Sequence, residues 1–231
     1  MNDDLGAQRN ADYDRQTVAV MERSLGRNSN CVDVGAYIGT FLAEMLRIAP
    51  QGIHFAFEPV PESFQKLAAS FGSFPNVRLH RVALSDAAGT SVFHLLEGCP
   101  QYSGLKKRWY GPGEHTVREI RVRTAPLDEV VPPDLVIDFI KIDVEGAELQ
   151  VLRGALGIIR RSRPVIVFEH GLGAADKYGT TPEAVHDLLA GECALRFSLM
   201  GDWLQHKPPL TRQSFADAFY TGGQFYFMAH P

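Results

Sequence analysis

Three charged residues, Lys141, Asp143 and Glu145, alternate along the stretch IKIDVEGAELQVLRGA. Successive side chains of a β-strand point to opposite faces, so this spacing predicts that all three lie on one face of a strand ending at Gly146. Buried charges persist when they are paired or when they do chemistry. We favour chemistry over a purely internal ion-pair network, with Asp143 and Glu145 as candidate catalytic groups.

His170 follows the apolar run PVIVFE and is the first candidate for a general base. The adjacent Glu169 is expected to orient its ring or raise its basicity. The competing interpretation is a structural histidine bonded to the backbone. The other histidines and the three cysteines show no H-E-x-x-H motif and no clustered spacing, so no metal is expected.

The loop DVGAYIG, residues 33–39, carries two glycines four residues apart after a carboxylate. The dinucleotide fingerprint needs glycines two and then three residues apart, so a pyrophosphate ligand is disfavoured. The observed pattern suits a ligand with an amino acid tail, because glycine permits close backbone approach and Asp33 can pair with an ammonium group. A tight turn that needs glycine for backbone reasons alone explains the same residues.

Two more polar sites follow apolar runs. Glu58 ends the run HFAF, where a carboxylate can accept hydrogen bonds from both ribose hydroxyls; a surface glutamate before a turn is the alternative. Ser85 and Asp86 follow VRLHRVAL, where a side chain can reach an adenine edge, although the same residues are ordinary turn formers. Ligands bind beyond the carboxyl ends of strands in doubly wound sheets, so these residues are expected to border one site.

The elements that position these residues alternate between short apolar strands and amphipathic helices, which predicts a parallel sheet covered by crossover helices. A long helix over 12–25 is expected to precede them. Strands are expected at 31–35, 54–59, 77–85, 138–146, 164–171, 194–201 and 224–230, and helices at 40–49, 61–71, 147–159 and from Pro182, with Thr181 as N-cap. The fold class is therefore α/β, a doubly wound seven-stranded sheet with an antiparallel C-terminal hairpin.

Residues 90–97 and 119–124 are expected to form a β-hairpin inserted between the third and fourth core strands. This insert is basic in an acidic chain, with Lys106, Lys107, Arg108, Arg118, Arg121 and Arg123 against Glu114 and Glu119. A solvated hairpin face explains such a run. Because Tyr102, Trp109 and Tyr110 lie in the same segment, we also consider a mobile lid that holds an anionic or glycosylated acceptor.

Composition excludes several classes of protein. Lys plus Arg number 23 and Asp plus Glu 27, a net charge of −4, which argues against a duplex-DNA binder. No apolar run approaches the ~20 residues that span a bilayer, and the start of the chain is polar and acidic, unlike a secretory signal. We predict a cytoplasmic protein with no nucleic-acid or membrane partner, organised as a helical extension over 1–30 and a main domain over 31–231. We leave open whether the chain forms a homo-oligomer.

Four stretches, VDVGAYIGTF, FAFEPVPESF, VALSDAAG and IKIDVEGAELQVLRGA, followed by a strand ending in FEHG, resemble the FkbM family of S-adenosylmethionine-dependent methyltransferases. The resemblance runs from Cys31 to about Gly171, and its fourth stretch is the most specific. It implies a class I methyltransferase (Rossmann-like) fold, S-adenosylmethionine as methyl donor, and O-methylation of a sugar or other natural-product hydroxyl. Tyr37 stands where the family usually has Asn, and a larger aromatic residue there alters how the methionine tail is covered.

On this resemblance the expected cofactor contacts are Asp33, Gly35, Ala36, Tyr37, Gly39, Thr40, Glu58, Pro59, Ser85, Asp86 and Asp143. The expected partner is a small-molecule acceptor, with His170, Asp143 or Glu145 as its proton acceptor. Two alternatives remain: a non-catalytic module that binds S-adenosylmethionine or a nucleotide, and a nicotinamide-dependent oxidoreductase, which needs the other glycine spacing.

Overall fold

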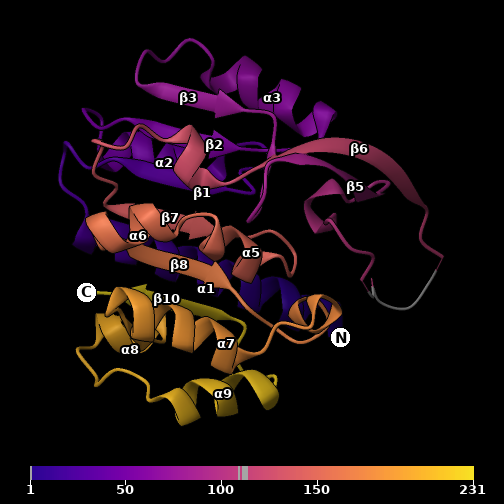
Figure 1. Ribbon diagram of the computed structural model, residues 1–231. Helices are drawn as coiled ribbons and strands as arrows, with labels where there is room; N and C mark the ends of the chain where they lie inside the picture. The colour runs from indigo at the N-terminus through magenta and orange to yellow at the C-terminus, as the bar shows by residue number, and fades with distance from the viewer. Residues whose placement is uncertain (1, 109, 111–113) are drawn as a thin grey trace.

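The computed structural model describes residues 2–108, 110 and 114–231. A seven-stranded sheet with the order β3-β2-β1-β7-β8-β10-β9 forms its centre, and only β10 runs antiparallel to its neighbours (Figure 1). Its strands are β1 (Cys31–Val34), β2 (His54–Phe57), β3 (Val77–His80), β7 (Phe139–Ile142), β8 (Val165–Glu169), β9 (Arg196–Ser198) and β10 (Tyr226–His230). This is the predicted doubly wound α/β sheet.

The helices cover both faces of the sheet, because the buried strands alternate their apolar side chains between the two sides. They are α1 (Asn2–Ser24), α2 (Thr40–Ile48), α3 (Pro61–Phe71), α4 (Leu127–Val130), α5 (Glu148–Arg153), α6 (Leu156–Ser162), α7 (Pro182–His186), α8 (Met200–Leu204) and α9 (Arg212–Tyr220). On one face Phe139 and Met228 pack with α1, α2 and α8, and on the other Ile140 and Phe168 pack with α5, α6, α7 and α9.

The third predicted strand, 77–85, is divided between two sheets. Only β3 stays in the main sheet, and the chain then leaves it at Arg81. β4 (Ala83–Leu84) instead pairs in parallel with β6 (Val117–Ala125), which pairs antiparallel with β5 (Gly89–Leu96). The two long strands extend away from the main sheet (Figure 1). An apolar run alone could not show this change of partner, because both halves of the run have strand character.

The C-terminal strands also differ from the prediction. β9 and β10 pair antiparallel, but they are no simple hairpin, because α8 and α9 lie between them in the chain.

The predicted helix over 147–159 is divided at Gly154. The Cα of Gly154 lies so close to Ser85 that an added Cβ would be 2.1 Å from the Ser85 carbonyl oxygen. Thr181 caps α7 as expected, accepting a hydrogen bond from the Ala184 backbone.

The N-terminal helix begins earlier than residue 12 and packs on the sheet. Its residues Val20 and Met21 are fully buried against Phe139 and Met228. The division of the chain into an extension over 1–30 and a main domain over 31–231 stays a prediction. Within the described part of the chain, no helix is both long and apolar enough to cross a membrane.

Candidate active site

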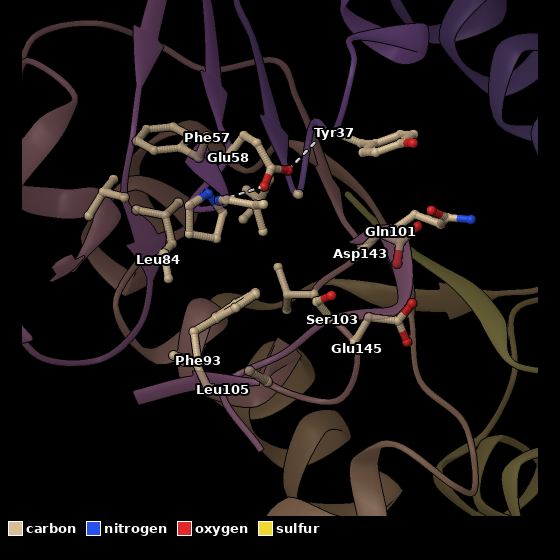
Figure 2. A pocket seen from close by; sticks show the side chains of 18 of the residues that line it. Tyr37, Phe57, Glu58, Leu84, Phe93, Gln101, Ser103, Leu105, Asp143 and Glu145 are labelled. Atoms are coloured by element: carbon tan, nitrogen blue, oxygen red, sulfur yellow. Dashed lines mark hydrogen bonds between the residues drawn. The ribbon is translucent and has the colours of Figure 1, made fainter. Parts of the chain in front are cut away.

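A pocket of about 550 Å³ of empty space, partly open to solvent, lies at the carboxyl ends of β1, β2 and β7. Its walls include Glu58 and Pro59 after β2, and Asp143 after β7. Figure 2 shows Glu58 on one wall, with Phe93 and Leu105 opposite it and Asp143 and Glu145 at one side. The predicted ligand site at the strand ends is thus a real cavity.

Glu58 is held in place by two backbone hydrogen bonds. The Tyr37 amide donates to its Oε2 at 2.9 Å and the Val60 amide donates to its Oε1 at 2.8 Å. Burial raises the pKa of Glu58 to about 7, because these two bonds only partly offset the loss of water. A carboxylate has about four acceptor positions, so two remain for hydroxyl groups in the pocket.

The glycine loop is shaped by contacts within the protein. Gly35 has φ 77°, and a Cβ there would lie 1.9 Å from the backbone oxygen of Asp143. Only glycine at position 35 therefore lets the loops that follow β1 and β7 come this close. Tyr37 also has a left-handed backbone, φ 50°, a conformation for which Asn is enriched over aromatic residues. Gly35 and Tyr37 line the pocket, whereas Ala36, Gly39 and Thr40 do not.

Asp33 is not a pocket residue. Its side chain is 1% exposed, and the Lys141 ammonium lies 4.0 Å from its Oδ1. Burial raises the pKa of Asp33, while the Lys141 charge lowers it. The cation that faces Asp33 is therefore Lys141, which corrects the expectation that Asp33 meets a ligand ammonium group at the pocket wall.

Ser85 and Asp86 likewise do not line the pocket, although Ala83 and Leu84 of β4, directly before them, do. The Ser85 hydroxyl donates to Asp86 at 3.2 Å, and both remain turn residues. The apolar wall comes instead from Phe57, Leu84, Phe93 and Leu105. Two of these belong to the insert, a contribution that the sequence analysis missed.

Lys141 and Asp143 share a face as predicted, but Glu145 reaches the site differently. β7 ends at Ile142, and Glu145 has a left-handed backbone, φ 61°. Glu148 shapes this loop: its Oε1 accepts hydrogen bonds from the amides of Val144 and Gly146. A turn, and not strand alternation, brings Glu145 beside Asp143.

Glu169, at the end of β8, completes an acidic cluster with Asp143 and Glu145, in which one carboxylate oxygen of each lies within 4.8 Å of the others. β8 lies beside β7, and Glu169 faces the same side as Lys141 because Val167, two residues earlier, is the register partner of Lys141. The pairing of Val167 with Lys141 could have indicated that Glu169 lies on the same face as Asp143. Sequence analysis treated that residue only as a neighbour of His170.

The three carboxyls ionise differently. Burial raises the pKa of Asp143, but Lys141, 3.3 Å away, and the Tyr226 hydroxyl, which donates at 2.6 Å, outweigh it, so the net shift is downward. Burial raises the pKa of Glu145 to about 8, although Arg108 pairs with it. Burial and the nearby Glu145 charge raise the pKa of Glu169 well above its ordinary value. These shifts favour the ionised form at Asp143 and the protonated form at Glu145 and Glu169.

The acidic cluster has ligand atoms close enough for a metal ion, so the prediction of no metal stays untested. Two cationic side chains, Lys141 and Arg108, already face these carboxylates.

His170 does not face either the pocket or the acidic cluster. Neighbouring residues of a strand point to opposite faces, so it cannot share the side of Glu169. Its ring is fully buried and stacks on Phe219 at 4.6 Å and on Phe215 at 6.1 Å. Burial lowers its pKa to about 4. This placement contradicts its predicted role as the general base, and neither ring nitrogen has a hydrogen-bond partner among the described residues.

The insert closes over the pocket. Phe93 of β5 and Ser103 and Leu105 of the following loop line it, and Arg108 pairs with Glu145. Lys106 is held away from the site by the Lys177 carbonyl at 3.1 Å. Trp109, named with the aromatic residues of this segment, lies outside the described residues.

The strand order and the pocket at its switch point define a class I methyltransferase fold. The chain belongs to the FkbM methyltransferase domain family, whose model matches residues 33–199. Methyltransferase FkbM from Methylobacillus flagellatus has the same fold, with a TM-score of 0.54 at 16% identity over 90% of this chain and 44% of that one.

Two curated relatives are similar in sequence. Methyltransferase sdnD of Sordaria araneosa is 32% identical over 57% of this chain and 62% of its own length. The 2-O-methyltransferase NoeI of Sinorhizobium fredii is 28% identical over 64% of this chain and 65% of its own length. The chain thus spans less than two thirds of these relatives.

Proposed function

We propose that this chain transfers a methyl group from S-adenosylmethionine to a hydroxyl oxygen of a sugar or another natural product. Membership of the FkbM family supports the methyl transfer, and the name of NoeI, a 2-O-methyltransferase, supports oxygen as the acceptor atom. The observation that carries the proposal is the acidic cluster beside the strand-end pocket, in which the pKa of Asp143 is lowered and the pKa values of Glu145 and Glu169 are raised.

The pocket residues fit the proposed cofactor. Glu58 offers free acceptor positions for ribose hydroxyls, and the apolar wall of Phe57, Leu84, Phe93 and Leu105 suits a purine ring. When bound, S-adenosylmethionine supplies a methyl group that is activated by a sulfonium charge. Asp143, whose pKa is lowered, lies on the same pocket, and its carboxylate complements such a cation.

The protein's own chemical task is to accept the hydroxyl proton and to hold the acceptor in line. A hydroxyl becomes a good nucleophile only as its proton leaves. Asp143, kept ionised by Lys141 and Tyr226, is the group that takes the proton, and Glu169 lies beside it in the acidic cluster. Lys141 and Tyr226 are positioning residues in this scheme. Most of the remaining catalysis comes from orienting two bound reactants.

Calorimetry with S-adenosylhomocysteine, followed by transfer of a radiolabelled methyl group to a panel of glycosides, tests the proposal. We expect S-adenosylhomocysteine to bind and NAD not to bind. Tight binding without transfer to any hydroxyl acceptor would favour the non-catalytic module. Binding of NAD in preference to S-adenosylhomocysteine would restore the oxidoreductase alternative.

A further inference from the structure

A second cavity lies on the other side of the acidic cluster from the cofactor pocket. Four separate segments line it. They contribute Arg9 of α1, Arg108 of the insert, Glu169 at the end of β8 with Leu172 after it, and Gln224 and Phe225 before β10. The two cavities meet at the cluster, because Glu169 lines this one while its neighbours Asp143 and Glu145 line the other.

The first turns of α1 are built into this cavity. The Tyr13 hydroxyl donates to Gln224 at 2.8 Å, and the Tyr13 ring packs edge-on against Phe225 with centroids 4.8 Å apart. One helical turn earlier, the Arg9 guanidinium lies 4.3 Å from the Phe225 ring centroid. Residues four apart share a helix face, so Arg9 and Tyr13 both contact Phe225, and of these two Arg9 lines the cavity.

Arg9 has few polar contacts of its own. Its Nη2 donates to the Gly222 carbonyl at 3.4 Å, a long bond, and no ion pair joins Arg9 to a carboxylate among residues 8–108, 110 and 114–231, whose side chains the structure describes. Arg108, by contrast, is engaged by Glu145. Burial and the Glu145 charge raise the pKa of Glu169, which favours its neutral form. The lining of this cavity thus holds two arginines and one glutamate, an excess of positive charge.

Building on the proposed function, we propose that this cavity holds the methyl acceptor and that Arg9 binds an anionic group on it, a carboxylate or a phosphate. A guanidinium offers a planar fork of donors that matches either group. Leu172, which is 52% exposed, and Phe225 supply apolar surface for the acceptor's ring. With the anion at Arg9, a hydroxyl of the same acceptor can approach the Asp143 and Glu169 carboxyls.

Calorimetric titration of the full chain, saturated with S-adenosylhomocysteine, tests this. The probes are methyl β-D-glucuronide, glucose 6-phosphate and the neutral methyl β-D-glucoside. We expect one anionic probe to bind about tenfold or more tightly than the glucoside, as one charge-assisted contact implies. Which of the two binds better distinguishes carboxylate from phosphate recognition. The R9Q variant should lose the preference, and the R9K variant, which keeps the charge, should regain part of it.

The matched control is Arg15→Gln, which removes an exposed arginine of the same helix that pairs with Asp12 and lines neither cavity. It should leave the preference intact. The assignment of Arg9 would be overturned by any of three results: equal binding of the three probes, no binding of any of them, or a preference for the anionic probe that persists in R9Q. Failure of S-adenosylhomocysteine to bind would instead defeat the proposed function, so the two failures are distinct.

Discussion

The two cavities beside the acidic cluster are built from different parts of the chain. The cofactor pocket is lined by residues 34–147, which all fall within the family match of 33–199. The second cavity draws Arg9, Gln224 and Phe225 from outside that match. The family match thus covers the whole lining of the proposed cofactor pocket but only part of the lining of the proposed acceptor cavity.

The cavities also differ in charge. The cofactor pocket combines an apolar wall with the carboxyls of Glu58, Asp143 and Glu145, whereas the second cavity contributes Arg9 and Arg108. Anionic walls suit a sulfonium ligand and cationic walls suit an anionic acceptor. Substitutions on the two sides should therefore affect different measurements.

The largest effect is expected where the cavities meet. Asp143→Asn removes the group that takes up the acceptor proton, so kcat should fall by about 10²-fold or more, while affinity for S-adenosylhomocysteine changes by less than about threefold. Single-turnover methyl transfer and calorimetry measure the two quantities.

Asp12→Asn, at an exposed residue of α1 that pairs with Arg15 and lines neither cavity, is the control for this variant. A loss of cofactor affinity larger than the loss of turnover would reassign Asp143 to cofactor binding.

A change at Glu58 should act on the cofactor side alone. Glu58→Ala should weaken binding of S-adenosylhomocysteine by roughly 1.5 to 3 kcal/mol, the range for hydrogen bonds to a charged group. The variant's affinity for glycoside probes should stay near that of the parent chain. Unchanged cofactor affinity in the calorimeter would remove Glu58 from the site.

The pH dependence of S-adenosylhomocysteine binding tests whether the ionised form of Glu58 binds the ligand. Its pKa of about 7 in the free protein means that lowering the pH protonates it before the ligand arrives. The ionised form accepts hydroxyl donors, so affinity should be full above this pKa and should fall by about tenfold between about pH 8 and pH 6. Glu58→Gln should bind weakly at every pH, and a parallel fall in that variant would point to another group.

The smallest effect is expected at His170. His170→Phe keeps a ring against Phe219 and Phe215 and removes ring nitrogens that are buried without a partner, so turnover should stay within about threefold and thermal stability should not fall. Melting curves and kcat measured on the same preparation check both expectations. A loss of about 10²-fold in kcat from a folded variant would return His170 to the catalytic groups.

Much of the cofactor side could be predicted from local patterns. Alternation placed Lys141 and Asp143 on one face, and the position of Glu58 after β2 put it at the pocket. Ser85, Asp86 and Asp33 were misplaced, because a pattern of apolar residues does not show which sheet a strand joins or which charge a buried carboxylate faces.

The sequence by itself determined the seven strands of the main sheet in chain order, the glycine loop and the carboxyls at the ends of β2 and β7, since these depend on periodicity and on nearby residues. Only the tertiary structure decided that Glu169 joins Asp143, that Arg108 reaches Glu145, and that Arg9 lies beside Phe225. Those contacts join residues far apart in the chain. Their formation depends on how whole elements pack, which no local spacing records.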